Sequence, residues 1–154
     1  MKTTPLALTL ALSLGLAVPA LAQNGGSLYQ QNCAFCHGDA GQGRPGAFPP
    51  LAGHSVDLVS RPGGRSVIVQ IVLFGIQGEI SVNEQRYNGV MPGYAQLRDE
   101  EIASLLNFVL RAWGNDKLLP QGYPPFTAAE VAAERSRRLT PLQVYENRRR
   151  INPR

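Results

Sequence analysis

The chain has 154 residues, a length typical of one domain with enough apolar residues to enclose a core. Its 16 Gly and 12 Pro favour a small fold with many loops and argue against an extended regular sheet. The positive charge is concentrated at one end: residues 23–116 carry 6 Arg against 8 Asp or Glu, whereas residues 117–154 carry 8 Lys or Arg against 3 Glu.

The N-terminal segment has the features of a secretory signal peptide. Lys2 precedes an uncharged stretch rich in Leu and Ala, which ends in the small-x-small sequence ALA before Gln23. We expect cleavage after Ala22, so that residues 1–22 direct export to the periplasm or the outer face of the cytoplasmic membrane. The alternative is an uncleaved anchor, which the Pro, Thr, Ser and Gly residues within the stretch disfavour. Export argues against nucleic acid as the partner of the basic tail, which is better interpreted as a solvated helical face.

Both cysteines of the chain lie in the sequence CAFCH, in which His37 directly follows Cys36. A structural zinc site needs four ligands, and beyond Cys33, Cys36 and His37 only His54 is available. A thioredoxin-like pair is expected at the end of a strand in a βαβ unit, whereas a Gly-Gly pair and a short polar segment precede this one. A disulfide that closes so small a loop would stabilise the fold little. Covalent attachment of haem remains.

The spacing of CAFCH has a physical reason in haem attachment, for which CxxCH is the known signal. Residues three apart lie on one face of a helix, so Cys33 and Cys36 can both form thioethers with the vinyl groups of one porphyrin. The next residue, His37, can then bind the iron. We predict one covalent haem c, anchored by Cys33 and Cys36, with His37 as the proximal iron ligand.

The segment 66–90 contains one ambiguous element and one clear one. Residues 66–78, SVIVQIVLFGIQG, are rich in β-branched residues, which favour a strand. After them, GEISV and QRYNGV flank Asn83 and Glu84, which predicts a short β-hairpin. We expect this hairpin to keep water from one edge of the haem.

The second axial ligand of the iron decides between electron transfer and small-molecule chemistry. Met91, in YNGVMPGYAQL, is the only methionine that remains after removal of the signal peptide. Pro92 favours an extended backbone at Met91, and the flanking glycines allow a loop to approach the ring closely. His54 is the competing candidate, interpreted as a surface or core histidine. We predict Met91 as the distal ligand, because a Met/His pair saturates the iron and raises its potential.

The C-terminal third predicts three helices. In residues 99–114, DEEIASLLNFVLRAWG, apolar residues recur every three or four positions, acidic residues occupy the first turn, and Gly114 is expected to end the helix. Thr127 and Glu130 form a capping box, and Thr140 followed by Pro141 indicates another helix start. We therefore expect residues 117–154 to form a helical extension packed on the preceding domain.

These residues resemble the class I cytochromes c over residues 25–114: CxxCH near the N-terminus, the loop GAFPPLAG, a methionine further on and a C-terminal helix. The resemblance implies a mostly α fold around one covalent haem, with residues 23–116 as the haem domain and residues 66–78 as a buried helix. It also implies that Gly25 and Tyr29 on the first helix pack against the last helix, at Leu105 and Phe108.

The same resemblance identifies a proline next to the haem. Pro49, or Pro50 beside it, matches the family proline whose carbonyl accepts a hydrogen bond from the proximal imidazole and fixes its orientation.

The whole chain is also similar to the Thermus-type soluble cytochromes c-552, through GQGRPGAFPPLAGH, YNGVM and a long C-terminal extension. This resemblance implies a monomeric electron carrier of the respiratory chain and not an enzyme. Its implied acceptor is a terminal cytochrome c oxidase of the ba type and its implied donor a quinol-oxidising complex, so it reaches the membrane surface only through partners.

Three alternative functions remain open. They are a haem enzyme or gas sensor with an open iron site, an electron-transfer partner of a periplasmic dehydrogenase, and a thiol-disulfide oxidoreductase. Met91 argues against the first. The histidine that follows Cys36 and the lack of a βαβ pattern argue against the third.

Overall fold

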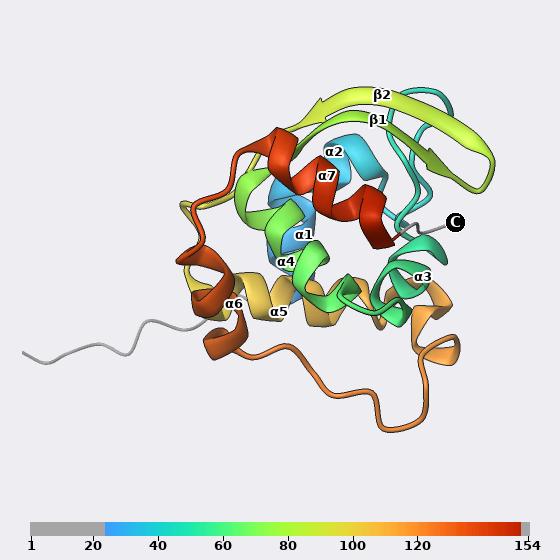
Figure 1. The fold of residues 1–154 in the computed structure, drawn as a ribbon. Helices are drawn as coiled ribbons and strands as arrows, with labels where there is room; N and C mark the ends of the chain where they lie inside the picture. The colour runs from blue at the N-terminus through green and yellow to red at the C-terminus, as the bar shows by residue number, and fades with distance from the viewer. Residues whose placement is uncertain (1–23, 152–154) are drawn as a thin grey trace, which may run out of the picture.

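In the computed structural model of the protein, which describes residues 24–151, helices surround one antiparallel hairpin (Figure 1). The predicted signal peptide therefore lies outside the described residues. No helix within residues 24–151 is long and apolar enough to cross a membrane. The elements are α1 (Gly25–Asn32), α2 (Ala34–His37), α3 (His54–Ser60), α4 (Gly64–Phe74), β1 (Ile76–Val82), β2 (Gln85–Met91), α5 (Asp99–Val109), a 3₁₀ helix (Ala112–Lys117), α6 (Ala128–Arg135) and α7 (Pro141–Ile151). The expectation of a mostly helical fold with a short hairpin is confirmed.

The close packing of α1 on α5 depends on a residue without a side chain. A Cβ atom at Gly25 would lie 2.1 Å from the carbonyl oxygen of Ser104, so only glycine permits this approach. One turn further, the ring centroids of Tyr29 and Phe108 are 5.7 Å apart. The two helices therefore meet through the small and aromatic positions expected from the sequence.

The predicted helix over residues 66–78 is wrong at its C-terminal end. Helix α4 ends at Phe74, and Gly75 follows with a φ of +77°. A Cβ atom at Gly75 would lie 2.3 Å from the carbonyl oxygen of Met91, so the chain turns tightly there and enters β1 at Ile76. The hairpin is confirmed: Asn83 and Glu84, with φ of 50° and 66°, form a two-residue turn of the left-handed kind that matches strand twist.

The helix predicted for residues 99–114 begins at Asp99 as expected but ends at Val109. The Asn115 side chain donates a hydrogen bond to the carbonyl oxygen of Val109 at 2.7 Å, which satisfies a backbone acceptor at the helix end. Trp113 has a φ of +55° and packs on Tyr29, with ring centroids 4.8 Å apart. Trp113 is thus part of an aromatic cluster and not of the helix.

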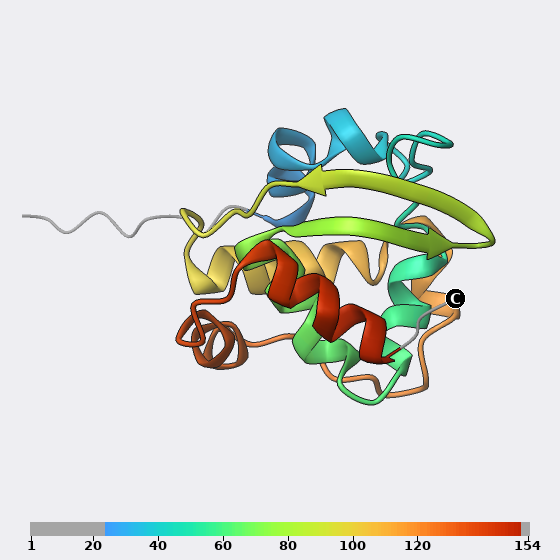
Figure 2. The same cartoon turned by 45° about the horizontal axis from the view of Figure 1, so that its top comes forward.

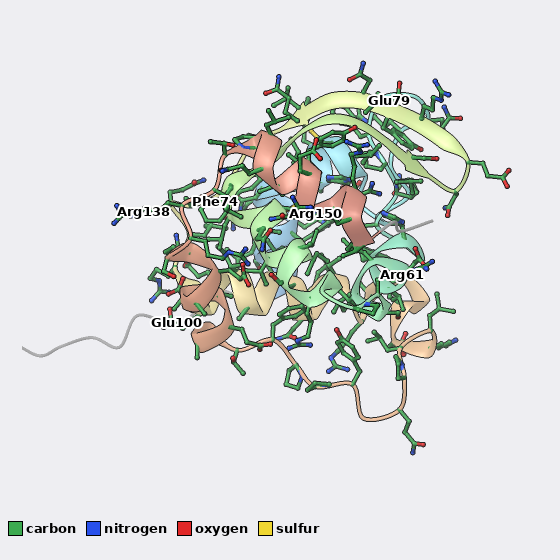
Figure 3. All side chains as sticks on the ribbon, viewed as in Figure 1. Arg61, Phe74, Glu79, Glu100, Arg138 and Arg150 are labelled. Carbon is green, nitrogen blue, oxygen red and sulfur yellow. The ribbon has the colours of Figure 1, made fainter. Side chains whose placement is uncertain are left out.

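The last two helices lie against the preceding elements, α6 beside α5 and α7 across α4 and β1 (Figures 1 and 2). Both predicted helix starts are confirmed, since Thr127 and Glu130 form the capping box of α6 and α7 begins at Pro141. The expectation of a wholly solvated basic face is wrong. Arg135 pairs with Asp99 at 2.7 Å and Arg148 is buried, whereas Arg138 lies at the outer surface (Figure 3).

Candidate functional site

A largely apolar cavity lies between α2, the hairpin, α4 and α7, and every residue that the sequence proposed as a cofactor ligand lines it. Figure 2 shows the hairpin crossing the molecule with α2 on one side and α7 on the other. The predicted ligands on its wall are Cys33, Cys36, His37 and Met91, with Pro49 beside them. Residues that are 58 positions apart in the chain are thereby brought to one site.

The hairpin contributes one face to this wall through alternate residues. Ile76, Gly78 and Ile80 of β1 line the cavity, and so do their register partners Met91, Gly89 and Tyr87 of β2. Side chains of a strand alternate between its two faces, so a single register sets all six. A Cβ atom at Gly89 would meet no protein atom within 4 Å, which leaves open space beside the methionine.

The two cysteines stand at the start of α2, with Cys33 as the N-cap residue and Cys36 one turn later. Both are free thiols in the structure. Burial, together with the smaller effect of the neighbouring Cys36, raises the pKa of the Cys33 thiol to about 11. Redox-active thiols in CxxC sequences have a lowered pKa, because the thiolate is the nucleophile. This environment therefore disfavours the thiol-disulfide oxidoreductase.

His37 is held in one orientation by Pro49. Its Nδ1 atom lies 2.9 Å from the Pro49 carbonyl oxygen, so the choice between Pro49 and Pro50 falls on Pro49. A carbonyl oxygen can only accept, so Nδ1 carries the proton and Nε2 keeps its lone pair for a metal. Burial lowers the pKa of His37, which also favours this neutral, ligating form.

Gly43 allows the loop around Pro49 to pack so closely on His37. Its amide donates to the carbonyl oxygen of His37 at 2.7 Å, and its φ is +69°. A Cβ atom there would lie 2.6 Å from both the carbonyl oxygen of Phe48 and the nitrogen of Pro50. In the same loop Gly46 has a φ of +76°, but a Cβ atom there would meet nothing within 4 Å.

We expect Gly43→Ala to lower the free energy of unfolding of the haem-loaded protein by roughly 2–4 kcal/mol, the sum of a left-handed alanine and an overpacked contact. Gly46→Ala should cost only the backbone part, roughly 1–2 kcal/mol. Thermal unfolding followed by circular dichroism measures both. Equal losses in the two variants would show that the loop does not pack tightly on the proximal side.

Met91 is the last residue of β2 and is half-buried, and the backbone after it is fixed on α4. The amide of Tyr94 donates to the carbonyl oxygen of Val72 at 2.8 Å. A Cβ atom at Gly93 would lie 2.6 Å from the carbonyl oxygen of Leu73. The methionine is therefore held on the cavity wall from both its strand and the loop that follows.

Two further residues of the cavity wall were not predicted. His54, interpreted as a surface or core histidine, is buried and lines the cavity, and Arg148 of α7 lies 3.3 Å from its Nε2 atom. The sequence did not suggest that Arg148 is buried, because it is the first of three consecutive arginines, a pattern typical of exposed residues. The available signal was helical spacing, because Arg148 occupies the same stripe of α7 as the buried Val144 and the partly buried Ile151.

The geometry disfavours zinc and fits a covalently bound haem. Among residues 24–151, no group of three or more His, Cys, Asp or Glu residues could hold a metal ion, as a zinc site would need. The cavity instead offers two thiols, a histidine with its Nε2 lone pair free, a thioether and an otherwise apolar wall with open space at Gly89. This donor set matches that of haem proteins with Met/His ligation.

Known proteins resemble the chain over most of its length. The family model of the cytochrome c oxidase, cbb3-type, subunit III matches residues 20–109. A cytochrome c-552 of Thermus thermophilus is 48% identical over 143 residues, which are 93% of this chain and 96% of that protein. The cytochrome c subunit of the quinone-dependent alcohol dehydrogenase of Gluconobacter oxydans is 36% identical over 94 residues, 60% of this chain but 19% of that subunit. The first of these relatives therefore also matches the C-terminal helices.

Proposed function

This chain belongs to the class I c-type cytochromes and carries covalent haem c with its iron, and on that premise we propose that it is an exported carrier of single electrons. In the proposal, Cys33 and Cys36 hold the haem by thioethers, while His37 and Met91 bind its iron. The haem supplies a one-electron couple between ferric and ferrous iron. We further propose residues 1–22 as the signal peptide, 23–116 as the haem domain and 117–154 as a C-terminal extension.

The observation that carries this proposal is the presence of a neutral histidine and a thioether on one apolar wall. The Pro49 carbonyl keeps a proton of His37 on Nδ1, and burial lowers the pKa of His37, so both favour the form whose Nε2 can bind iron. Met91 would also bind the iron, which leaves no open coordination for a substrate. In the proposal, the apolar side chains of the hairpin and α4 that line the cavity keep water from one edge of the haem, which favours electron transfer without bond making.

We expect the haem to stay with the protein in acid-acetone extraction, because thioethers survive loss of the iron ligands. The pyridine haemochrome spectrum should be that of haem c, with one haem per chain. Cys33→Ala combined with Cys36→Ala should release all colour into the solvent. If the wild-type protein lost its colour in the same treatment, the two cysteines would not be the anchors.

For the partners, we propose a terminal cytochrome c oxidase of the ba type as acceptor and a quinol-oxidising complex as donor. The similarity to cytochrome c-552 along nearly the whole chain supports this choice. A second candidate is a periplasmic dehydrogenase, which the match to a cytochrome subunit of an alcohol dehydrogenase favours. Carriers of this kind meet both partners through the exposed edge of the haem site.

The exposed surface beside CAFCH is largely apolar, with Phe35 80% and Val90 62% exposed, and Arg44 lies over the Phe35 ring at 5.5 Å from its centroid. We therefore expect the bimolecular rate of electron transfer to a ba-type oxidase to change by less than about threefold between low and physiological salt. Phe35→Asp should slow the reaction at least about tenfold, whereas Leu142→Asp, on the exposed surface of α7, should not.

Stopped-flow kinetics at several salt concentrations measure these rates. A steep fall of the wild-type rate with salt, abolished by neutralising Arg149 and Arg150, would assign recruitment to the basic tail instead. Arg148 does not belong in that comparison, because it is buried.

A further inference from the structure

The cavity wall contains a single formally charged side chain, apart from its histidines. Among the described residues that line the cavity, Arg148 is the only Arg, Lys, Asp or Glu, and it is 5% exposed. It stands between Asn147 and Arg149 on α7, and the next two arginines of the run are exposed to solvent. One arginine of three thus faces the cofactor cavity.

The protein partners of Arg148 are neutral. Its Nη2 atom donates to the carbonyl oxygen of Ser81 at 3.2 Å and lies 3.3 Å from Nε2 of His54. A guanidinium can only donate, so Nε2 of His54 accepts and that imidazole is neutral. Both recorded bonds use Nη2, and within residues 24–151 the Nε and Nη1 groups donate to no protein atom.

A buried guanidinium is costly unless an anion accompanies it. None of the ion pairs formed among the described residues includes Arg148. Among the charged groups around it, Asp57 has the largest effect and raises the pKa of Arg148, but Asp57 also pairs with Arg61 at 3.0 Å. Burial lowers the pKa of Arg148 to about 10, so it remains a cation at neutral pH.

Arg148 also lies far along the cavity from the methionine. It bonds to Ser81, whose register partner is Arg86 next to the hairpin turn, whereas Met91 pairs with Ile76 at the other end. The separation of five positions along each strand corresponds to roughly 17 Å. Figure 2 places α7 and the cysteine-bearing α2 on opposite sides of the hairpin. The two carboxylates of haem stand on the porphyrin edge opposite its vinyl groups, hence opposite the thioethers.

We propose that Arg148, oriented by His54 and Ser81, is a carboxylate-binding residue of the cavity and holds one propionate of the haem. This inference rests on the proposed role of Cys33 and Cys36 as haem anchors. The Nε and Nη1 groups, which donate to no protein atom within the described residues, remain available as donors to a carboxylate oxygen. The C-terminal extension thereby contributes a charge to the cofactor site of the preceding domain.

The test compares haem-loaded Arg148→Gln and Arg148→Lys with the matched control Arg149→Gln, whose exposed arginine pairs with Glu146. Carbon-13 is introduced into the haem carboxylates alone through labelled 5-aminolevulinate, and oxidised-minus-reduced infrared spectra are recorded at pH 8. The labelled bands of one carboxylate should shift in both Arg148 variants and stay unchanged in the control. In the same samples, Arg148→Gln should lower the equilibrium constant for reduction about tenfold, or about 59 mV for one electron.

Arg148→Lys should change that constant less than about threefold, because it keeps the charge but loses the guanidinium donors. Labelled bands identical in the wild type and both Arg148 variants would overturn the proposal. If Arg148→Gln does not fold, the infrared comparison of Arg148→Lys with the control decides alone. Release of haem from the wild-type protein by acid-acetone would instead overturn the proposed function together with this inference, so the two failures are distinguishable.

Discussion

Replacement of Met91 by Ala yields a folded haem protein whose reduction potential falls by on the order of 0.2 V, since axial ligands set haem potentials over about 0.8 V. In the proposed ligation, the thioether at the end of β2 favours ferrous iron, so its loss should open one coordination position. The reduced variant should bind carbon monoxide, which the wild-type protein should bind poorly. Potentiometric titration and visible spectra in the presence of carbon monoxide measure both changes.

Asn88→Ala is the matched control for this experiment, because Asn88 lies on the same strand as Met91, is exposed and does not line the cavity. It should leave the potential and the carbon monoxide spectrum unchanged. If Met91→Ala kept the wild-type potential and stayed closed to carbon monoxide, His54 would be the first alternative ligand, since it is buried on the same wall.

The sequence predicted those local elements that are determined by side chains close together in the chain. The hairpin turn at Asn83 and Glu84 and the capping box at Thr127 are examples, because each depends on a few consecutive residues. The ends of α4 and α5 were misjudged because distant residues decide them. Gly75 must clear the carbonyl of Met91, and Asn115 caps the end of α5.

The same division applies to the site. Covalent attachment is encoded within five consecutive residues, so the sequence indicated the cofactor directly. The tautomer of His37 follows from a carbonyl twelve residues away, which only the resemblance to known cytochromes suggested. The meeting of His54 with Arg148 joins residues 94 positions apart. No local sequence pattern predicts a contact between residues so far apart, and the three consecutive arginines at positions 148–150 suggested exposure to solvent instead.

Deletion of residues 118–154 should lower the stability of the haem protein more than any point substitution discussed above. The segment buries Phe126, Val131 and Val144, each worth about 1.5–3 kcal/mol in apolar burial. Arg65 would also lose its bonds to Glu130 and to the carbonyl oxygens of Pro124 and Pro125. The combined loss of roughly 5–9 kcal/mol approaches the whole stability of a typical domain.

Point variants distinguish a stabilising role of the C-terminal helices from a role in docking, and they keep the part of the cavity wall that α7 supplies. Val131→Ala and Val144→Ala, both fully buried, should each lower the free energy of unfolding by about 2 kcal/mol, and Leu142→Ala on the exposed side of α7 by less than about 0.5 kcal/mol. Thermal melts by circular dichroism give these values, and oxidase turnover should be unaffected in all three. The full deletion should in addition change the reduction potential, since it removes Arg148 from the cavity. Unchanged melting with a large fall in turnover would show that the C-terminal helices bind the partner and do not stabilise the fold.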